Sequence, residues 1–427
     1  MSKNLTNVRH NRWSTQTQLL RIATRNVMRN RRRSLLTLFA IGFSIAVVVS
    51  VNGVLNGLQA TIKEKVLLGQ TGLLQVHKKG FADNVSRSPL SFGIEDAAAL
   101  VATIEKVPGV VAATARINFF TMANANDTTI FTLAFAVDPI NELRTCPRKQ
   151  DEWGSLRVSG DKGLVSPEVS RQLAASGAQP QDKLGASTDV TLLAPDLEGV
   201  LNAANLSVAG VLDNNPAFSG EKKLVYLPLA QAQDLLRMPG QAVEIAVRGD
   251  DFDHPEALAA AVQRAVGPGY EVQTWKQLAK FVVDILGMQN AALGFVIAIF
   301  IAVLLIGIVN TMLMSVLERT REIGTMMAVG VRRSQIIELF IVESTLLGAL
   351  GAAVGAGLGL VAVAVMHHIG IPLRPPGTLK PEAVRPFVSM HFVLVTMGLS
   401  MLGGAAAAIY PARRASKLSP VDALGAV

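Results

Sequence analysis

The chain has 427 residues, of which 50% are hydrophobic and 17% charged, and its formal net charge is +8. Soluble domains carry about 25% charged residues, so this composition indicates a membrane protein that also has a sizeable aqueous part. A nucleic-acid-binding groove is excluded, because the basic cluster from Arg29 to Arg33 contains no aromatic residue that could stack on a base.

The N-terminal segment, residues 1–33, contains nine Lys and Arg residues and no acid. Apolar residues recur in it at helical spacing, among them Leu20, Ala23 and Val27, with arginines between them. This pattern predicts a basic amphipathic helix that lies in the cytoplasmic membrane interface. The alternative is a simple positively charged flank of the first membrane span.

Four uncharged stretches are long enough to cross a bilayer, which requires about 20 apolar residues. They are Ser34–Ile62, Ile285–Leu317, Ser344–Leu373 and Pro386–Ala412. We therefore predict four transmembrane α-helices, at residues 34–62, 285–317, 336–366 and 391–412. The apolar core of the first is too long for an ordinary cleaved signal peptide, so we expect an uncleaved anchor.

Basic residues set the predicted orientation, because loops rich in Lys and Arg remain in the cytoplasm. The N-terminal segment, the 318–335 loop and the 413–427 tail are basic, so both termini are expected on the cytoplasmic side of a bacterial inner membrane. Residues 63–284 and the short loop 367–390 are then external. Residues 59–286 carry 26 acids and 21 bases, and a long domain of this kind can be translocated whatever its charge.

The long external segment mixes strand and helix patterns. Alternating or β-branched runs typical of strands occur at 72–80, 128–137 and 243–249. Helical periodicity with an acidic first turn occurs at 95–107 and 254–266. Apolar stripes also continue beyond the first span to Val66 and begin before the second at Leu278, which predicts stalk helices. We therefore predict a membrane protein with a large α+β extracytoplasmic domain inserted between helices 1 and 2.

The sequence offers no catalytic pattern. Phosphate-loop, HExxH and GxSxG motifs are absent, as is any Cys/His spacing typical of a metal site. Cys146 is the one cysteine and cannot form an intramolecular disulfide. The neighbouring His367 and His368 would point in different directions on a helix, which favours an interfacial role over metal binding. We expect no enzymatic activity and no catalytic, cofactor or metal residue in this chain.

Two features of the predicted third helix concern its packing. Glu343 is an acid inside the predicted third span, for which a proton relay and an ion pair or helix-terminus contact that fixes the packing register are the alternatives. The absence of a second acid or histidine at matching depth nearby in the sequence favours the ion pair or helix-terminus contact. Gly351, Gly355 and Gly359 form two GxxxG steps, which allow close approach of another helix from the same chain or from a partner subunit.

The stretch ERTREIGTMMAVGVRRSQI, residues 318–336, connects the second and third spans. Its apolar residues Ile323, Met326 and Met327 are predicted to share one face of a short helix, which Gly330 would end, with Ser334 capping the next helix. A face of this kind fits a groove on another protein. The alternative is a helix that rests on the lipid headgroups.

These residues resemble the permease subunits of MacB-like ABC transporters, also called FtsX-type permeases. The family signature ERxREIGxxxAxG is matched between Glu318 and Gly330, a glutamate of the third span is matched by Glu343, and Tyr410–Leu424 is similar to the segment after the fourth span. The resemblance implies a coupling helix that docks into a separate ABC ATPase, which would bind ATP and Mg. Its expected residues are Glu318, Arg321, Glu322, Ile323, Gly324, Met326, Met327, Ala328 and Gly330.

The resemblance also implies two lobes in the outer domain, two ATPase copies per complex, and a second permease as a homodimer or heterodimer partner. With 33 residues before the first span, the layout is most similar to the lipoprotein-releasing permeases of the LolC/LolE type. The expected function is ATP-driven mechanotransmission that extracts lipoproteins, lipids or amphiphiles, with membrane lipids and a periplasmic carrier or adaptor as further partners. The alternatives are tripartite efflux of peptides or drugs, and mechanical control of a cell-wall hydrolase.

Overall fold

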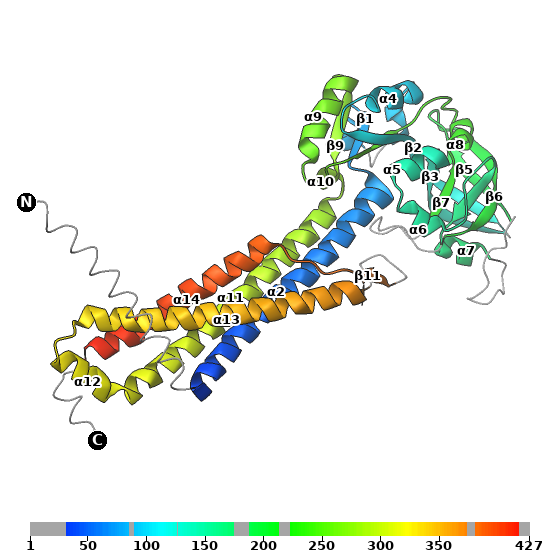
Figure 1. The fold of residues 1–427 in the computed structure, drawn as a ribbon. Helices are drawn as coiled ribbons and strands as arrows, with labels where there is room; N and C mark the ends of the chain where they lie inside the picture. Colours follow the sequence, from blue (N-terminus) through cyan, green and yellow to red (C-terminus); the bar gives the residue numbers. More distant parts are fainter. Residues whose placement is uncertain are drawn as a thin grey trace, which may run out of the picture. The chain divides into compact units, whose positions relative to one another are not determined.

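The computed structural model describes residues 31–84, 89–125, 127–174, 188–212, 223–373 and 381–417 (Figure 1). These residues form two compact units. The membrane unit comprises the chain up to Leu58, Gly287–Ile371, and the chain from Ala383 onward, whereas the outer unit comprises Gln59–Leu286 and Pro372–Glu382. The predicted N-terminal amphipathic helix and most of the predicted 413–427 tail lie outside the described residues.

Four helices among the described residues are long and apolar enough to cross a membrane. They are α2 (Arg31–Val66), α11 (Lys280–Glu318), α13 (Arg333–Ile369) and α14 (Met390–Ser416). Each extends beyond the predicted membrane segment at both ends, because polar residues such as Lys63 and Lys65 continue the helical hydrogen-bond pattern outside the apolar stretch. The last turns of α2 and the first turns of α11 belong to the outer unit.

The glycine stripe of α13 packs on α2 of the same chain. A Cβ atom added to Gly355 would lie 2.4 Å from the carbonyl oxygen of Gly42, and one added to Gly359 would lie 2.8 Å from Cβ of Val49. No side chain fits at such distances, so these glycines allow the two backbones to approach closely. The neighbour that the sequence left open is therefore a helix of this chain.

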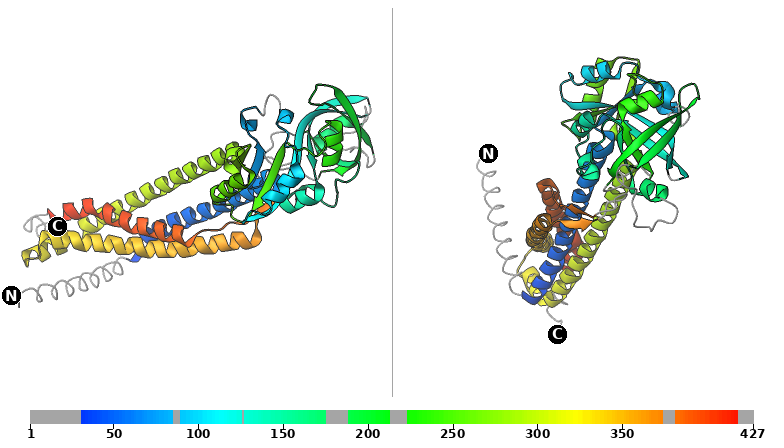
Figure 2. Two further views of the ribbon diagram at one scale, coloured as in Figure 1. Left: turned by 90° about the horizontal axis from the view of Figure 1, so that it is seen from above. Right: turned by 90° about the vertical axis from the view of Figure 1, so that its right-hand side faces the viewer.

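Helix α13 packs on α14 through another set of small residues, and the two helices lie side by side in all views (Figures 1 and 2). The hydroxyl of Ser344 donates a hydrogen bond to the carbonyl of Gly404 at 2.6 Å, and Ser400 donates to the carbonyl of Gly348 at 3.4 Å. These bonds satisfy buried hydroxyls within the helix pair.

The segment before α14 contacts the ends of α2 and α13. The backbone N–H of Phe387 donates to the carbonyl of Gly53 at 3.2 Å, and the ring Nδ1 of His367 lies 2.9 Å from the carbonyl oxygen of Pro386. His367 thus has a structural contact with this segment. Two short strands next to it, β10 (Ile371–Leu373) and β11 (Glu382–Val384), pair with each other.

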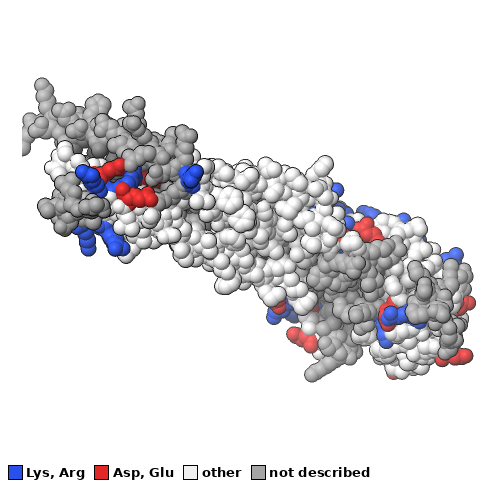
Figure 3. Space-filling model, turned by 90° about the horizontal axis from the view of Figure 1, so that it is seen from below, with Lys and Arg blue, Asp and Glu red and all other residues white. Residues whose placement is uncertain are grey.

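The membrane unit has an uncharged surface over the middle of its helices. Figure 3 shows this face without Lys, Arg, Asp or Glu among the described residues, and both kinds of charge gather at one end of the unit. The exposed apolar residues of the membrane unit include Phe295, Ile299 and Ile306 of α11. An uncharged belt of this kind is what lipid hydrocarbon requires of a protein surface.

The outer unit is built on one sheet of nine strands among the described residues, in the order β3-β7-β4-β6-β5-β2-β8-β1-β9. The strands are β1 (Leu74–Lys78), β2 (Val110–Ala125), β3 (Thr128–Val137), β4 (Lys162–Val165), β5 (Asp189–Pro195), β6 (Leu201–Val211), β7 (Leu224–Pro228), β8 (Glu244–Gly249) and β9 (Tyr270–Thr274).

The long strand β2 divides this sheet into two lobes. Its second half also pairs with β3, which closes β2, β3, β7, β4, β6 and β5 into a six-stranded ring around the largest apolar core. We call this the ring lobe (Figure 2). Its first half pairs with β8, and β8, β1 and β9 complete an antiparallel sheet, the sheet lobe. On the sheet lobe pack α4 (Ala97–Ile104) and α9 (Pro255–Val266).

All five outer segments with a predicted pattern contain the predicted kind of element. The strands β1, β3 and β8 and the helices α4 and α9 fall within them. The described residues of the ring lobe also form the short helices α6 (Lys149–Trp153), α7 (Pro167–Leu173) and α8 (Leu229–Leu235). Another short helix, α5 (Pro139–Thr145), follows β3 in the chain and packs on β2 and β8. A π-helical segment, η1 (Leu67–Thr71), follows α2 directly.

Candidate functional site

The charged stretch after α11 forms the short helix α12 (Thr320–Ala328). Arg319 precedes its first residue, and the chain turns at Gly330, whose φ of 103° favours glycine. The segment 318–335 is therefore one short helix and a turn between the ends of α11 and α13. The prediction that Ser334 caps the next helix is wrong: Arg332 holds the N-cap position, and its backbone N–H donates a hydrogen bond to Oε1 of Gln335 at 2.9 Å.

One face of α12 is buried against the membrane unit. Ile323 is 1% exposed and belongs to the same apolar core as Ile336, Phe340 and Ala412, and Met326 and Met327 pack at the margin of this core. The expectation that Ile323 and the two methionines form a free docking face is therefore corrected. Helices α13 and α14 of this chain cover the apolar face of α12. The spacing of the apolar residues fits packing against these helices as well as it fits packing into a groove of a partner.

The opposite face of α12 is exposed. Arg321, Glu322, Thr325 and Ala328 lie on it, and the following Val329 is 83% exposed. The exposed Glu318 ends α11 just before it. This face combines charges of both signs with a small apolar tip, which are features of a surface that another protein recognises.

Arg319 and Glu343 join α12 to α13. The Arg319 Nη1 atom donates to the two carboxylate oxygens of Glu343 at 3.3 and 3.5 Å, and both residues are less than 9% exposed. Arg319 Nε also lies 3.4 Å from Oε2 of Glu322 on α12. The favoured interpretation of Glu343 as an ion-pair partner agrees with this contact, although no pattern in the sequence indicates Arg319 as its partner.

The residues predicted to contact the ATPase fall into three groups according to their exposure. The charged members, Ala328 and Gly330 are exposed, Ile323 and Gly324 are buried, and the two methionines are half-buried. The glycines predicted to pack helices lie on α13, where Gly351 faces Ile41 and Gly355 faces Gly42. Among the described residues, no cluster of three or more His, Cys, Asp or Glu could hold a metal ion.

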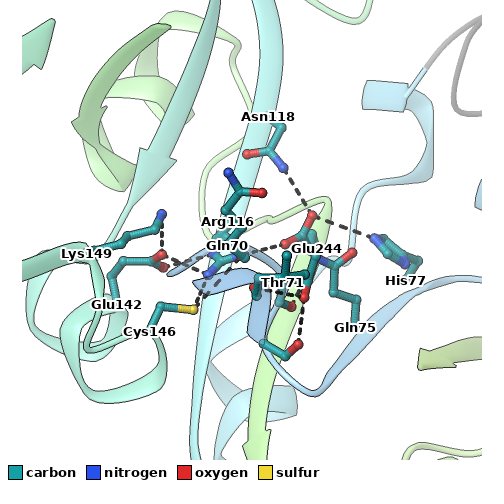
Figure 4. A network of polar contacts seen from close by, with 12 residues as sticks. Gln70, Thr71, Gln75, His77, Arg116, Asn118, Glu142, Cys146, Lys149 and Glu244 are labelled. Atoms are coloured by element: carbon teal, nitrogen blue, oxygen red, sulfur yellow. Dashed lines mark hydrogen bonds and ion pairs between the residues drawn. The ribbon is translucent and has the colours of Figure 1, made fainter. Parts of the chain in front are cut away.

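A second polar cluster, which sequence reasoning missed, lies inside the outer unit (Figure 4). Arg116 on β2 donates from Nε and Nη2 to the carboxylate of Glu142 at 2.9 and 2.8 Å, and from Nη1 to Glu244 at 2.9 Å. Lys149 Nζ lies 2.6 Å from Oε1 of Glu142. We call this cluster the Arg116 network; its members are Gln70, His77, Arg116, Asn118, Glu142, Cys146, Lys149 and Glu244.

The charges of the Arg116 network balance one another. Burial alone would raise the pKa of Glu142, but the positive charges of Arg116 and Lys149 outweigh it and lower that pKa from 4.5 to about 2. The pKa of Glu244 is also lowered, against the effect of burial, by His77 and Arg116. Arg116, the single charged residue of the sixteen-residue strand β2, was the one sequence signal that could have revealed this cluster.

Two family models match the chain. The model of the MacB-like periplasmic core domain matches residues 34–265, and that of the FtsX-like permease C-terminal domain matches residues 294–420. The first of these covers more than half of the chain, and together the two models extend over both units described above.

Several curated proteins are similar in sequence. The macrolide export ATP-binding/permease protein MacB of Azoarcus sp. is 26% identical over 413 residues, which is 95% of this chain and 58% of that protein. The protein of the same name from Hyphomonas neptunium is 32% identical over 234 residues, or 52% of this chain and 34% of that protein. An uncharacterized ABC transporter permease of Methanocaldococcus jannaschii is 33% identical over 178 residues, 41% of this chain and 43% of that protein. The chain thus spans less than two thirds of the length of each.

Proposed function

The chain belongs to the family of MacB-like, FtsX-type ABC transporter permeases, and on that premise we propose that it couples ATP hydrolysis in a separate ATPase subunit to movement of its outer unit. The observation that carries the proposal is the orientation of α12, whose apolar side is anchored in the membrane unit while its charged side is exposed. A helix held in this way can move with α11 and α13 as one body when a partner displaces it.

The ATPase is proposed to grip the exposed side of α12, on the cytoplasmic face of a bacterial inner membrane. Arg321 and Glu322 would set the orientation of the contact, and Val329 would fill an apolar pocket at its centre. ATP and Mg would be bound by the partner. Two such ATPase copies would serve a pair of permeases.

Lipoproteins, lipids or amphiphiles of the outer leaflet are the proposed cargo. Helices α2, α11 and α14 enclose an apolar recess of about 190 Å³, lined by residues such as Ile45, Leu304 and Leu399, which suits an aliphatic chain. A second candidate is efflux of drugs through an adaptor, which the macrolide-export names of the MacB relatives favour.

A substitution in the exposed face of α12 tests the proposal. A charge forced into a desolvated contact costs about 2–5 kcal/mol, so Val329→Asp should weaken ATPase binding about 30-fold or more. The two proteins would be co-expressed, and the ATPase recovered with the tagged permease would be measured in detergent. Ala203→Asp, which adds the same charge to an exposed site of the outer unit, is the matched control.

Recovery of the ATPase should fall with Val329→Asp and stay unchanged with Ala203→Asp. Equal recovery from the wild type and Val329→Asp, with normal membrane insertion of both, would contradict docking through this face.

A further inference from the structure

Arg116 stands where β2 passes from one lobe of the outer unit to the other. It is the last residue of β2 that pairs with β8, opposite Glu244, and the first that pairs with β3, opposite Val137. The backbone of this one residue is therefore hydrogen-bonded into the sheet lobe on one edge and faces the ring lobe on the other.

The side chain of Arg116 uses its full set of donors. A guanidinium group has five N–H bonds in a fixed planar fork. Here Nε and one Nη2 hydrogen go to Glu142, the other Nη2 hydrogen to Sγ of Cys146 at 3.0 Å, and Nη1 donates to both Glu244 and the backbone carbonyl of Gln70 at 2.6 Å.

These acceptors come from three different parts of the outer unit. Glu244 lies on β8 of the sheet lobe, and Glu142 lies on α5, which follows β3 of the ring lobe in the chain and packs on β2 and β8. Gln70 lies on η1, which begins directly after the last residue of α2. The backbone N–H of Arg148 adds a second bond to this segment, to the carbonyl of Leu68 at 2.9 Å.

A contribution to the stability of the fold does not by itself account for a buried network of ion pairs. A buried ion network usually contributes no more to stability than well-packed apolar residues of the same size. What the rigid guanidinium fork provides is geometry, because it holds several acceptors at fixed directions and distances. The Arg116 network therefore fixes the position of η1 relative to both lobes.

We infer that Arg116 is a positioning residue that ties the end of helix α2 to both lobes, so that displacement of α2 moves the outer unit as a single body. The inference rests on the proposed function, in which α2 carries motion away from the membrane. The Arg116 network makes this connection rigid. Its loss would loosen the last turns of α2 against an otherwise intact outer unit, with the contacts of Arg148 to Leu68 and Glu64 remaining.

Distance measurements on the full-length permease in nanodiscs, without ATPase, test this directly. Spin labels would be placed on exposed alanines of the three parts: Ala60 on α2, Ala98 on the sheet lobe and Ala203 on the ring lobe. Double electron–electron resonance then gives the 60–98, 60–203 and 98–203 distance distributions. Native Cys146 is buried and should remain unlabelled.

Arg116→Lys keeps the positive charge but loses the fork. We expect the 60–98 and 60–203 distributions to lose their single narrow distance, while the 98–203 distribution stays narrow because β2 itself joins the lobes. Glu168→Gln, which removes a half-buried charge paired with the exposed Arg171, is the control and should leave all three unchanged.

If Arg116→Lys does not fold, a network made neutral by Arg116→Met, Lys149→Met, Glu142→Gln and Glu244→Gln takes its place, with the same expectation. Three unchanged distributions in the variant that folds would overturn the inference, and equal broadening of all three would overturn it too, since the network would then only stabilise the fold. Neither result would affect ATPase docking, which the recovery experiment on Val329 decides separately.

Discussion

The guanidinium of Arg319 lies 3.3 Å from the carboxylate of Glu343, and this buried ion pair joins the start of α12 to α13. Arg319 is the N-cap residue of α12, so the pair holds the short helix at the point where the chain leaves α11. The buried Ile323, one turn further on, gives the helix a second attachment. A force applied to the exposed face of α12 would therefore reach α13 through a charged contact and an apolar one.

Removal of Glu343 should loosen this attachment. Glu343→Ala leaves Arg319 buried with only the more exposed Glu322 beside it, and breaking one partner of a buried pair costs about 3–5 kcal/mol. We expect a lower Tm of the purified permease and reduced recovery of the ATPase. Both would be measured in the same detergent preparation.

An apolar pair at the same positions provides the control. Arg319→Met combined with Glu343→Leu removes both charges, so most of the lost Tm should return. A Tm of Glu343→Ala equal to that of the wild type would show that the pair does not hold α12.

The sequence predicted the element types well, because their signals are local. Long uncharged stretches identified the four apolar helices, and periodicity identified strands such as β3 and helices such as α9. What a local pattern cannot give is the partner of a residue far away along the chain. The pairing of Arg319 with Glu343, 24 residues apart, and that of Arg116 with Glu244, 128 residues apart, both escaped prediction for this reason.

The face of α12 was assigned wrongly for a related reason. The spacing of Ile323 and Met326 shows that one side of the helix is apolar, and it does so correctly. Periodicity does not reveal which surface covers that side. The decision depends on where α13 and α14 place Phe340 and Ala412, which is a property of the tertiary fold.

The close contact of Gly355 on α13 with α2 predicts that an added methyl group destabilises the protein at this position but not two residues further along the helix. Gly355→Ala would place Cβ 2.4 Å from the Gly42 carbonyl oxygen, so the helices must separate, at a cost of about 1–3 kcal/mol. The neighbouring Gly357→Ala meets no atom within 4 Å and should stabilise the helix slightly, if it changes anything. Thermal unfolding in detergent would compare them, and equal Tm values for the two variants would contradict this helix contact.

The predicted orientation places α12 and the outer unit on opposite sides of the membrane. A cysteine at Val329 should be shielded from an impermeant thiol reagent in right-side-out inner-membrane vesicles, and one at Ala203 should react. Both positions are exposed in the fold, so accessibility is not limited by packing, whereas buried Cys146 should stay silent. Labelling of Val329→Cys in sealed vesicles would refute the orientation.

Glu152 on α6 predicts how the stability of the outer unit depends on pH. Its Oε2 is buried without a hydrogen-bond partner, and burial raises its pKa from 4.5 to about 7 despite the nearby charges of Lys149 and Lys65. Between these two pKa values the folded protein retains a proton that the unfolded chain has released. The free energy of unfolding therefore falls as pH rises through this window, by up to about 3 kcal/mol in all.

Glu152→Gln removes the titratable carboxyl group, so the fall in the free energy of unfolding with rising pH should be abolished. The Tm of the variant should nearly match that of the wild type near pH 4, where the Glu152 carboxyl group is mostly protonated in the folded and unfolded states, and exceed it at pH 8. The fluorescence of the buried Trp153 and Trp275 reports unfolding of this unit. Asp161→Asn, a change at an exposed carboxylate, should show no such growing difference. A Tm difference between Glu152→Gln and the wild type that stays constant from pH 4 to pH 8 would mean that Glu152 is already ionised in the fold, with Lys149 as its counter-charge.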